Sequence, residues 1–313
     1  MNLTWARLTL RLSRFELLAF GGFVALFIVA TALTAARIDA VRPPVECLTT
    51  FDVLPIGCDL KANAWYEAQN GVAGLSMGLL IFLSFAAGLF LGVPIVAREL
   101  ERGTARLAWS LAPSRMRWYL ARMLPVLIQL AFITYVAGIA AERYVAATTV
   151  ETDLANSFTS FGFRGLLIAS RAVFVFAVGV AVGSIIARAL PAVIIATVIA
   201  AIGLAGGERV HQMILASEAV AVPADQTGTN PYQGDLYIDQ KFVLPDGSLV
   251  DYGYFGGADP YDINGNPKYP IMNLVVPGER YRFVETREAL ALAGGSLVAL
   301  VFAGFVVSRR RPG

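Results

Sequence analysis

The stretch that decides the fold is GLLIASRAVFVFAVGVAVGSIIARALPAVIIATVIAAIGLAGG, residues 165–207. It contains two apolar runs, 165–187 and 189–207, which meet at a turn over residues 188–191. A transmembrane helix needs roughly 17–25 apolar residues, so each run is long enough to cross a bilayer. Arg171 is the one charged residue inside either run. The stretch therefore predicts two helices that cross a membrane in opposite directions.

Four further runs lack Asp, Glu, Lys and Arg and are of similar length: residues 17–36, 68–97, 123–141 and 289–308. Apolar residues make up 57% of the 313 residues and charged residues 15%, whereas soluble domains carry about 45–50% and about 25%. We therefore predict an all-α polytopic membrane protein with six transmembrane helices, the first five of them within residues 17–207.

The composition also excludes several activities for this chain. Its three lysines, Lys61, Lys241 and Lys268, are not followed by Ser or Thr, so the sequence lacks the GK[ST] phosphate-binding loop of an ATPase. His211 is the only histidine, which argues against a Ser-His or Cys-His hydrolase and a multi-histidine metal site. We therefore expect that the chain is not an enzyme, binds no cofactor, metal or nucleic acid, and has no catalytic residue.

The basic residues indicate which segments face the cytoplasm. With six spans, thirteen of the 25 basic residues lie in short segments on the same side as both termini. They are Arg7, Arg11, Arg14, Arg98, Arg102, Arg106, Arg115, Arg117, Arg122, Arg188, Arg309, Arg310 and Arg311. Because short basic loops stay in the cytoplasm, we predict that both termini are cytoplasmic.

Residues 1–16 predict an amphipathic helix that lies at the membrane interface. Trp5, Leu8, Leu12 and Phe15 recur at helical spacing opposite three arginines, so one face can enter the acyl boundary while the other contacts headgroups. A merely basic leader and a cleavable signal peptide are the alternatives. The signal peptide is disfavoured because the first apolar run exceeds the usual core of about 7–15 residues.

An outer loop, residues 38–67, carries both cysteines, Cys47 and Cys58. A disulfide is permitted outside the cytoplasm and would stabilise the protein by about 2–4 kcal/mol. We expect this bridge, and two free thiols are the alternative. Two soft ligands without a nearby histidine do not favour a metal site.

Residues 208–285 differ from the rest of the chain because they are acidic, rich in tyrosine and hold seven of the fifteen prolines. We predict a small extracytoplasmic domain with β-structure, followed by the sixth span and a basic tail over residues 286–313. Residues 240–250 predict a β-hairpin around Pro245-Asp246-Gly247. Residues 259–266 alternate oxygen side chains that suit calcium, but an Asx-rich turn gives the same pattern and no EF-hand glutamate follows.

The most informative segment is the basic loop 98–122 between the second and third spans. Gly103 and Pro113 interrupt its helical pattern, so we predict a short helix over about 104–111 with Thr104 as its N-cap. Glu99 and Glu101 precede this helix, and we expect them to pair with arginines near them in sequence: Arg98, Arg102 or Arg106.

Two interpretations of this loop follow from its residues. Leu107, Leu111 and Trp109 give the short helix apolar anchors that suit a cytoplasmic partner. Trp109, Trp118 and the arginines are equally typical of residues that hold a protein at the lipid interface. The residues alone leave both interpretations open.

Matching residues continue through and beyond the loop. The first set is Ala97-Arg98-Glu99-Leu100-Glu101, Gly103-Thr104, Arg106-Leu107-Ala108-Trp109, Ser114-Arg115 and Arg117-Trp118. Looser collinear matches are Gly179, Gly183, Arg188, Leu190, Pro191, Ala192, Pro277, Arg280, Tyr281 and Glu288. In these residues the chain resembles bacterial type-2 ABC transporter permeases, specifically in the first cytoplasmic loop and weakly in the outer domain.

The resemblance implies a membrane subunit of the bacterial plasma membrane that works with a second permease half, identical or homologous, and with cytoplasmic ATPase subunits. These separate subunits would bind ATP and Mg²⁺. The short helix would dock into the ATPase and transmit its closure. The residues implied in this coupling are Arg98, Glu99, Glu101, Gly103, Thr104, Arg106, Leu107, Trp109, Arg115, Arg117 and Trp118.

Arg171 departs from the pattern because the resemblance leads us to expect a small or apolar residue early in the fourth span. An arginine near the end of a span can extend its side chain to the interface, whereas a buried one marks a functional site. Arg171 is therefore expected either to extend outward or to line a cavity on the substrate path and contact an anionic substrate group.

The leading hypothesis is an ATP-driven exporter of an amphipathic or hydrophobic molecule, with a pathway lined by spans one, two and five by analogy. An ion-coupled carrier is an alternative, but we find no Asp or Glu inside the apolar runs. A non-transporting assembly that senses an envelope component is the other alternative.

Overall fold

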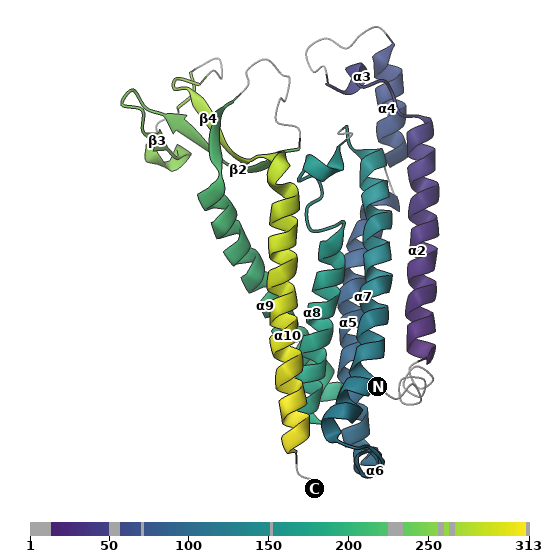
Figure 1. The fold of residues 1–313 in the computed structure, drawn as a ribbon. Coiled ribbons are helices and arrows are strands. Elements are labelled where there is room, and N and C mark those ends of the chain that lie inside the picture. The colour runs from purple at the N-terminus through teal and green to yellow at the C-terminus, as the bar shows by residue number, and fades with distance from the viewer. Residues whose placement is uncertain are drawn as a thin grey trace.

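The computed structural model describes residues 14–49, 57–69, 72–150, 153–224, 234–255, 260–262 and 267–310. The chain is mostly helical, and six of its helices are long and apolar enough to cross a membrane (Figure 1). They are α2 (Arg14–Ala40), α5 (Val72–Glu101), α7 (Arg115–Thr148), α8 (Leu166–Ile186), α9 (Ala189–Glu218) and α10 (Tyr281–Arg309). The predicted number and order of apolar helices are confirmed.

Two of these helices extend beyond the uncharged runs that predicted them. Helix α9 continues to Glu218, although its apolar run ends at residue 207, and α10 begins at Tyr281, eight residues before its run. Four charged residues in these extensions, Glu208, Glu218, Arg287 and Glu288, pair with residues of other helices. Because the helices extend beyond the uncharged runs, Glu208 and Glu288 lie inside long helices.

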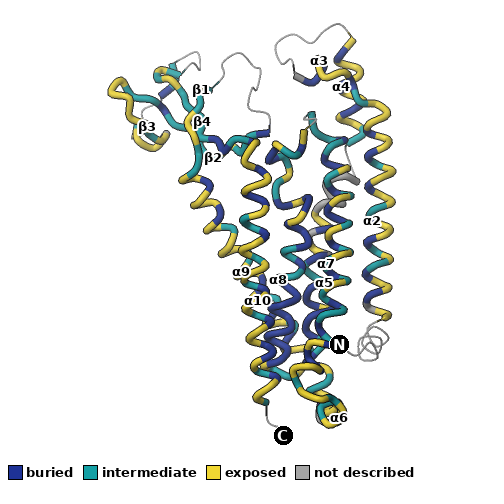
Figure 2. The backbone as a smooth tube through the Cα atoms, in the orientation of Figure 1, coloured by how far each residue is buried: buried dark blue, intermediate teal, exposed yellow. Residues whose placement is uncertain are grey.

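Helix α8 is the centre of the bundle. In its apolar segment 72% of the residues are buried, against 17% for α9 and 28% for α2. Figure 2 shows the buried residues gathered along α8 and the helices around it, while α2 and the outer part of α9 carry many exposed residues. Helices α5, α7, α9 and α10 all pack against α8, and α2 packs against α7.

Helices α5 and α8 approach each other closely because both carry small residues at their contact. A Cβ atom added to Gly92 would lie 2.5 Å from the Phe176 carbonyl oxygen, and one added to Gly183 would lie 2.8 Å from the Val93 carbonyl oxygen. Such small-xxx-small contacts let transmembrane helix backbones meet. The glycines form two pairs four residues apart: Gly88 and Gly92 in α5, and Gly179 and Gly183 in α8.

One end of the molecule carries short helices and a disulfide. Helices α3 (Glu46–Thr49) and α4 (Cys58–Gln69) follow α2, and Cys47 and Cys58 are bonded with a Cα–Cα distance of 5.2 Å. Trp65 of α4 is 1% exposed and packs with residues of α2 and α7. The predicted disulfide is therefore present.

The same end carries a four-stranded antiparallel sheet with strand order β1-β4-β2-β3. Strand β1 (Val220–Pro223) follows α9, and β4 (Ile271–Val276) precedes α10. Strands β2 (Leu236–Val243) and β3 (Leu249–Val250) form the predicted hairpin, with Phe242 opposite Val250. The Ser248 hydroxyl and amide donate to the turn carboxylate of Asp246, which lowers the pKa of that group.

The other end of the bundle holds the C terminus and the connections between α5 and α7 and between α8 and α9 (Figure 1). Arg14, the first described residue, lies toward this end too. The described segments that carry predicted cytoplasmic arginines therefore lie together, opposite the sheet and the disulfide. Most of the amphipathic helix predicted over 1–16, and most of the calcium segment 259–266, lie outside the described residues.

Candidate functional site

The short helix predicted over 104–111 is present as α6 (Thr104–Leu111), which joins α5 to α7. Gly103 has φ 70°, a left-handed conformation that turns the chain out of α5 and that glycine adopts readily. The prediction that Thr104 is the N-cap is wrong. Gly103 occupies the cap position, and the Thr104 hydroxyl donates instead to the Glu99 carboxylate at 2.5 Å.

The two glutamates at the end of α5 bind to other helices. Glu99 pairs with Arg122 of α7 at 3.0 Å, with side chains only 20% and 11% exposed. The Glu101 carboxylate accepts the backbone amide of Ala189 at 3.0 Å, at the N-terminus of α9, where a negative charge is stabilising. The α5–α6 corner is thereby fixed to both α7 and α9. The partners that we expected were Arg98, Arg102 and Arg106.

Two tryptophans hold α6 against the bundle. Trp109 meets Trp118 of α7 edge to face, with ring centroids 6.0 Å apart, and Trp118 is 1% exposed. The Arg115 guanidinium lies 4.7 Å from the Trp109 ring centroid, a cation–π distance. Trp118 packs inside the protein, so it does not serve as an anchor in lipid, and Trp109 is partly buried against it. Trp109 likewise serves to hold α6 in place.

The outer surface of α6 exposes two leucines beside the polar side chains of Thr104 and Ser110. Leu107 and Leu111 are 67% and 66% exposed, one turn apart, at the end of the molecule beyond the apolar core. Arg117 is exposed beside them, and its amide is bound by the Ser114 hydroxyl, which caps α7. The Arg106 side chain lies outside the described part of the chain. Exposed apolar residues on a fixed helix outside the membrane core are typical of a protein contact.

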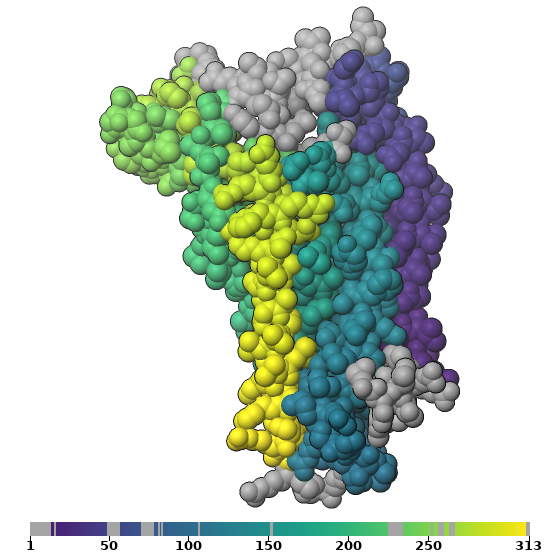
Figure 3. All heavy atoms as spheres, viewed as in Figure 1, coloured from purple at the N-terminus to yellow at the C-terminus, as the bar shows by residue number. Residues whose placement is uncertain are grey.

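A chain of polar contacts runs from α6 to the ends of α8 and α10. The Arg115 guanidinium, which covers Trp109, donates to the carbonyls of Ser308 and Arg310 at 3.2 and 2.5 Å. Arg310 in turn donates to the Ser184 carbonyl near the end of α8 at 2.5 Å. Figure 3 shows the α6–α7 segment beside the last turns of α10. A displacement of α6 would therefore act on α7, α8 and α10 together.

Arg171 of α8 lies in a second site, between α8, α9 and α10. It contacts Glu288 of α10 at 2.9 Å and Glu208 of α9 at 3.7 Å, and it donates to the Gly162 carbonyl at 3.1 Å. It also lines a cavity of about 570 Å³. Arg171 thus lines a cavity and also reaches toward the outer end of α8, and its place on a substrate path stays a prediction. Its anionic partners are two glutamates of the protein.

Sequence reasoning missed the neighbours of Arg171. His211 stacks on Phe161, with ring centroids 5.4 Å apart, and its Nε2 lies 3.7 Å from a Glu288 oxygen. Arg287 donates to Glu218 at 2.5 Å at the rim of the same cavity. His211 and Glu218 were assigned to the outer domain, because we took the end of the uncharged run at residue 207 as the end of the fifth span. Arg287 and Glu288 were assigned to the sixth segment, just before its uncharged run. The signal that could have found them is Arg171, since a charge inside an apolar run needs a partner from another helix.

A sequence model of one family, described as ABC-2 membrane transporter related, matches residues 18–207, more than half of the chain. The chain belongs to this family. No curated protein and no solved structure matches it. This ABC-2 membership points to the permease component of an ABC transporter, a multi-pass membrane subunit that is typically not itself catalytic and has an ATPase partner.

The ABC-2 match includes α6 and its contacts on α5, α7 and α9, as well as the disulfide. It ends inside α9, so the sheet, α10 and half of the Arg171 site lie outside it. The roles of individual loop residues in coupling stay predictions.

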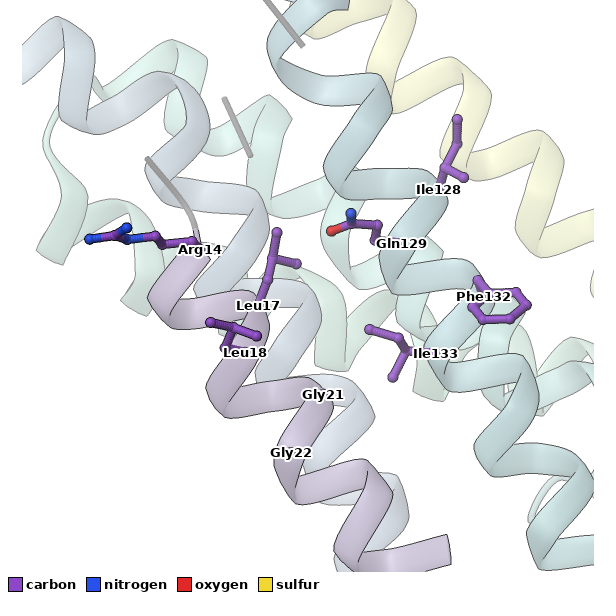
Figure 4. A pocket seen from close by; sticks show the side chains of 9 residues that line it. All are labelled: Arg14, Leu17, Leu18, Gly21, Gly22, Ile128, Gln129, Phe132 and Ile133. Atoms are coloured by element: carbon purple, nitrogen blue, oxygen red, sulfur yellow. The ribbon is translucent and has the colours of Figure 1, made fainter. Parts of the chain in front are cut away.

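The ABC-2 region also contains an apolar groove between α2 and α7, of about 640 Å³. Figure 4 shows Leu17 and Gly21 of α2 facing Gln129 and Ile133 of α7, while Arg14 points away from the groove. Arg14 lies toward the end that carries α6. The groove therefore opens between the first and third spans in the half of the bundle closer to α6.

Proposed function

We propose that this chain is the membrane subunit of an ATP-driven exporter of amphipathic or hydrophobic molecules. Separate cytoplasmic ATPase subunits bind ATP and Mg²⁺, and loop 98–122 receives their motion. The N and C termini then face the cytoplasm of a bacterial cell, and the sheet lies outside its plasma membrane. The disulfide at the sheet end supports this orientation, because disulfides persist outside the cytoplasm.

The observation that carries the proposal is the contrast between the two faces of α6. Its outer face exposes Leu107 and Leu111, whereas its inner face is held by Trp109, Trp118 and Arg115. A partner that grips the outer face moves the whole α5–α6–α7 corner, since the inner contacts transmit the force. The absence of a phosphate-binding loop in the sequence agrees with an ATPase on a separate subunit.

A second permease half completes the pathway in this proposal. Helix α9 is the least buried of the six long helices, and α2 also leaves most of its apolar surface exposed. The exposed positions on α9 include Ile194, Ile195, Val198, Ile199 and Ile202. Both lipid and a homologous half would cover such a surface. The family resemblance favours the second half, with spans one, two and five at the pathway.

Two substitutions in α6 separate binding from transmission. Leu107→Asp places a charge on the exposed face and is expected to weaken the complex with the ATPase at least about tenfold, because buried apolar anchors carry most interface energy. Leu249→Asp is the matched control, since this leucine is 45% exposed on β3 at the other end of the molecule. The assay is co-purification of each variant with cytoplasmic ABC ATPase subunits from the native cell. Equal binding by both variants would refute the docking face.

Trp109→Ala leaves the exposed leucines in place and removes the contact with Trp118 and Arg115. We expect the ATPase to bind this variant normally and to hydrolyse ATP, while export falls. The measurement is ATP hydrolysis and substrate efflux in the same vesicles. Unchanged efflux would show that transmission does not pass through Trp109.

An ion-coupled carrier is the second candidate, because Glu208 and Glu288 lie inside α9 and α10 rather than in loops. Both glutamates contact Arg171, however, so their charges are already compensated. A carrier would transport in vesicles that contain this chain alone and an ion gradient. The ABC proposal expects no transport there without the ATPase and ATP.

A further inference from the structure

The cavity beside Arg171 has an apolar part and a polar part. Its apolar walls come from Phe174 of α8 and from residues of α9 and α10, among them Val210 and Ile214, which are 52% and 37% exposed. The cavity therefore opens onto the outer surface of the bundle. Charged residues from all three helices close its other side: Arg171, Glu208, Arg287 and Glu288.

Glycines in α9 keep this space open. The Phe174 ring fits between Gly203 of α9 and Gly295 of α10, where added Cβ atoms would lie 3.1 and 3.2 Å from it. By contrast, a Cβ atom on Gly206 or Gly207 would meet no atom of the described residues within 4 Å. Gly206 and Gly207 both line the cavity. The Phe174 ring therefore separates α9 from α10 at Gly203 and Gly295, and the cavity lies next to this ring.

Several polar atoms at the cavity lack a partner. Within the described residues, His211 Nε2, Glu288 Oε2 and Arg287 Nη2 are buried without a hydrogen bond. The His211 side chain is only 8% exposed, and its Nε2 is 3.7 Å from the Glu288 oxygen, too far for a direct bond. Buried polar groups are almost always paired with protein, water or ligand. His211 Nε2 is an acceptor in the tautomer that carries its proton on Nδ1. With that tautomer the cavity offers two acceptors close together and one guanidinium donor.

We infer that this cavity binds a zwitterionic amphiphile whose headgroup carries a primary ammonium and an anionic group. An ammonium between His211 and Glu288 would donate to both, and the anionic group would accept from Arg287. The lining holds two arginines and two glutamates, so a headgroup without net charge fits it better than an anion or a cation alone. The apolar tail would lie along α9 on the side of Gly203 and Leu204, which is the direction of the middle of the bundle.

Two sources supply such a molecule: a lipid of the surrounding bilayer and the exported substrate. Binding itself does not depend on the proposed transport function, since the site belongs to this chain. Only the assignment of the ligand as transported substrate depends on that function. A binding test and a transport test can therefore fail separately.

The binding test uses the full chain purified in detergent and dioctanoyl phosphatidylethanolamine as the probe. Dioctanoyl phosphatidylcholine keeps the phosphate and the tails but has no N–H donor, and dioctanoyl phosphatidylglycerol has no cation. We expect the ethanolamine lipid to bind at least about tenfold more tightly than either. Equal binding of the three lipids would overturn the inference.

Gly207→Leu tests the location. Gly207 shares a helix face with Gly203 and His211, so the leucine side chain would fill the cavity without a clash. Gly294→Leu in α10 is the matched control, because its Cβ also meets no atom of the described residues within 4 Å and it does not line the cavity. We expect Gly207→Leu to lower the affinity for the ethanolamine lipid at least about tenfold and the control to leave it unchanged. Binding that survives Gly207→Leu would refute the site.

His211→Phe tests the headgroup contact while keeping the stacking on Phe161. This variant is expected to lose the preference for the ethanolamine lipid over the choline lipid, and a retained preference would contradict the assigned contact. In vesicles with the ATPase, ATP-dependent movement of a labelled ethanolamine lipid would identify the ligand as transported substrate. Binding without movement would identify it as a resident lipid and would leave the inferred site intact.

Discussion

The close contact of α5 with α8 makes a sharp prediction about two glycines of one helix. In Gly92→Ala, the new Cβ would lie 2.5 Å from the Phe176 carbonyl oxygen, and this neighbour is backbone that cannot rotate away. In Gly78→Ala, the new Cβ would meet no atom of the described residues within 4 Å. The same chemical change in α5 should therefore have opposite effects at the two positions.

The magnitude follows from the distance. Ordinary contact begins at 3.4 Å, so α5 and α8 must separate locally by about 0.9 Å in Gly92→Ala. A gap of this size forfeits about a quarter to a half of each dispersion contact, and overpacking costs about 1–3 kcal/mol. Replacing glycine by alanine in a helix gains about 1 kcal/mol. We expect a net loss of up to about 2 kcal/mol for Gly92→Ala and a gain of up to about 1 kcal/mol for Gly78→Ala.

The assay is thermal unfolding of the purified variants in one detergent, followed by helical circular dichroism. The midpoint should fall for Gly92→Ala and stay level or rise for Gly78→Ala. Equal midpoints for the two variants would refute the argument, because they would show that the glycine contact between α5 and α8 does not limit packing. A fall for both variants would instead mean that glycine flexibility itself is required.

Three further predictions concern other parts of the chain. Glu99→Gln should lower the free energy of unfolding. In a double-mutant cycle of Glu99→Arg and Arg122→Glu, the double variant should recover part of the stability that the two single variants lose. Strictly additive losses of stability would refute the pair. Cys58→Ser opens the loop of the outer helices and should lower the free energy of unfolding by about 2–4 kcal/mol. The measurement is the rate of proteolysis at these helices, which should rise. An unchanged rate would refute a stabilising disulfide. Hydrogen bonds from Ser248 lower the pKa of Asp246, so the folded hairpin gains stability above the unfolded pKa of about 3.9 and loses it as pH falls through the lower folded value. Protection factors of the hairpin amides, which are exchange rates corrected for the intrinsic pH dependence, should therefore fall below about pH 4 in the native chain, and Asp246→Asn should remove that step.

Local sequence signals predicted a large part of this fold. The apolar runs located the six long helices because each run exceeds the thickness of a bilayer. Breaks at Gly103 and Pro113 gave the bounds of α6, and the turn around Asp246 gave the β2–β3 hairpin. In each case the signal lies within a few residues of the structure that it determines.

Contacts between distant residues were harder to predict. Glu99 was expected to pair with an arginine near it in sequence, and its pairing with Arg122 was not predicted, because the turn at Gly103 brings α7 beside the end of α5. The role of Trp109 changed for the same reason, since the inward direction of its ring depends on where α7 stands. A one-dimensional pattern gives the face of a helix but not the helix that covers it.

The Arg171 site shows how such a contact could be anticipated. Arg171 lies five residues into α8 and Glu288 seven residues into α10, and both helices start at the end that carries the sheet. At 1.5 Å per residue these positions are about 7.5 and about 10 Å along their helices, so the two charges lie at similar depth. A buried charge is costly unless it is paired, and only a residue at matching depth on a neighbouring span can provide the partner. Comparing depths from the common end of the helices therefore narrows the partners on α10 to Glu285 and Glu288, about 6 and about 10.5 Å along that helix. The structure pairs Arg171 with Glu288, 117 residues away in sequence, because Glu285 instead accepts the backbone amide of Leu166.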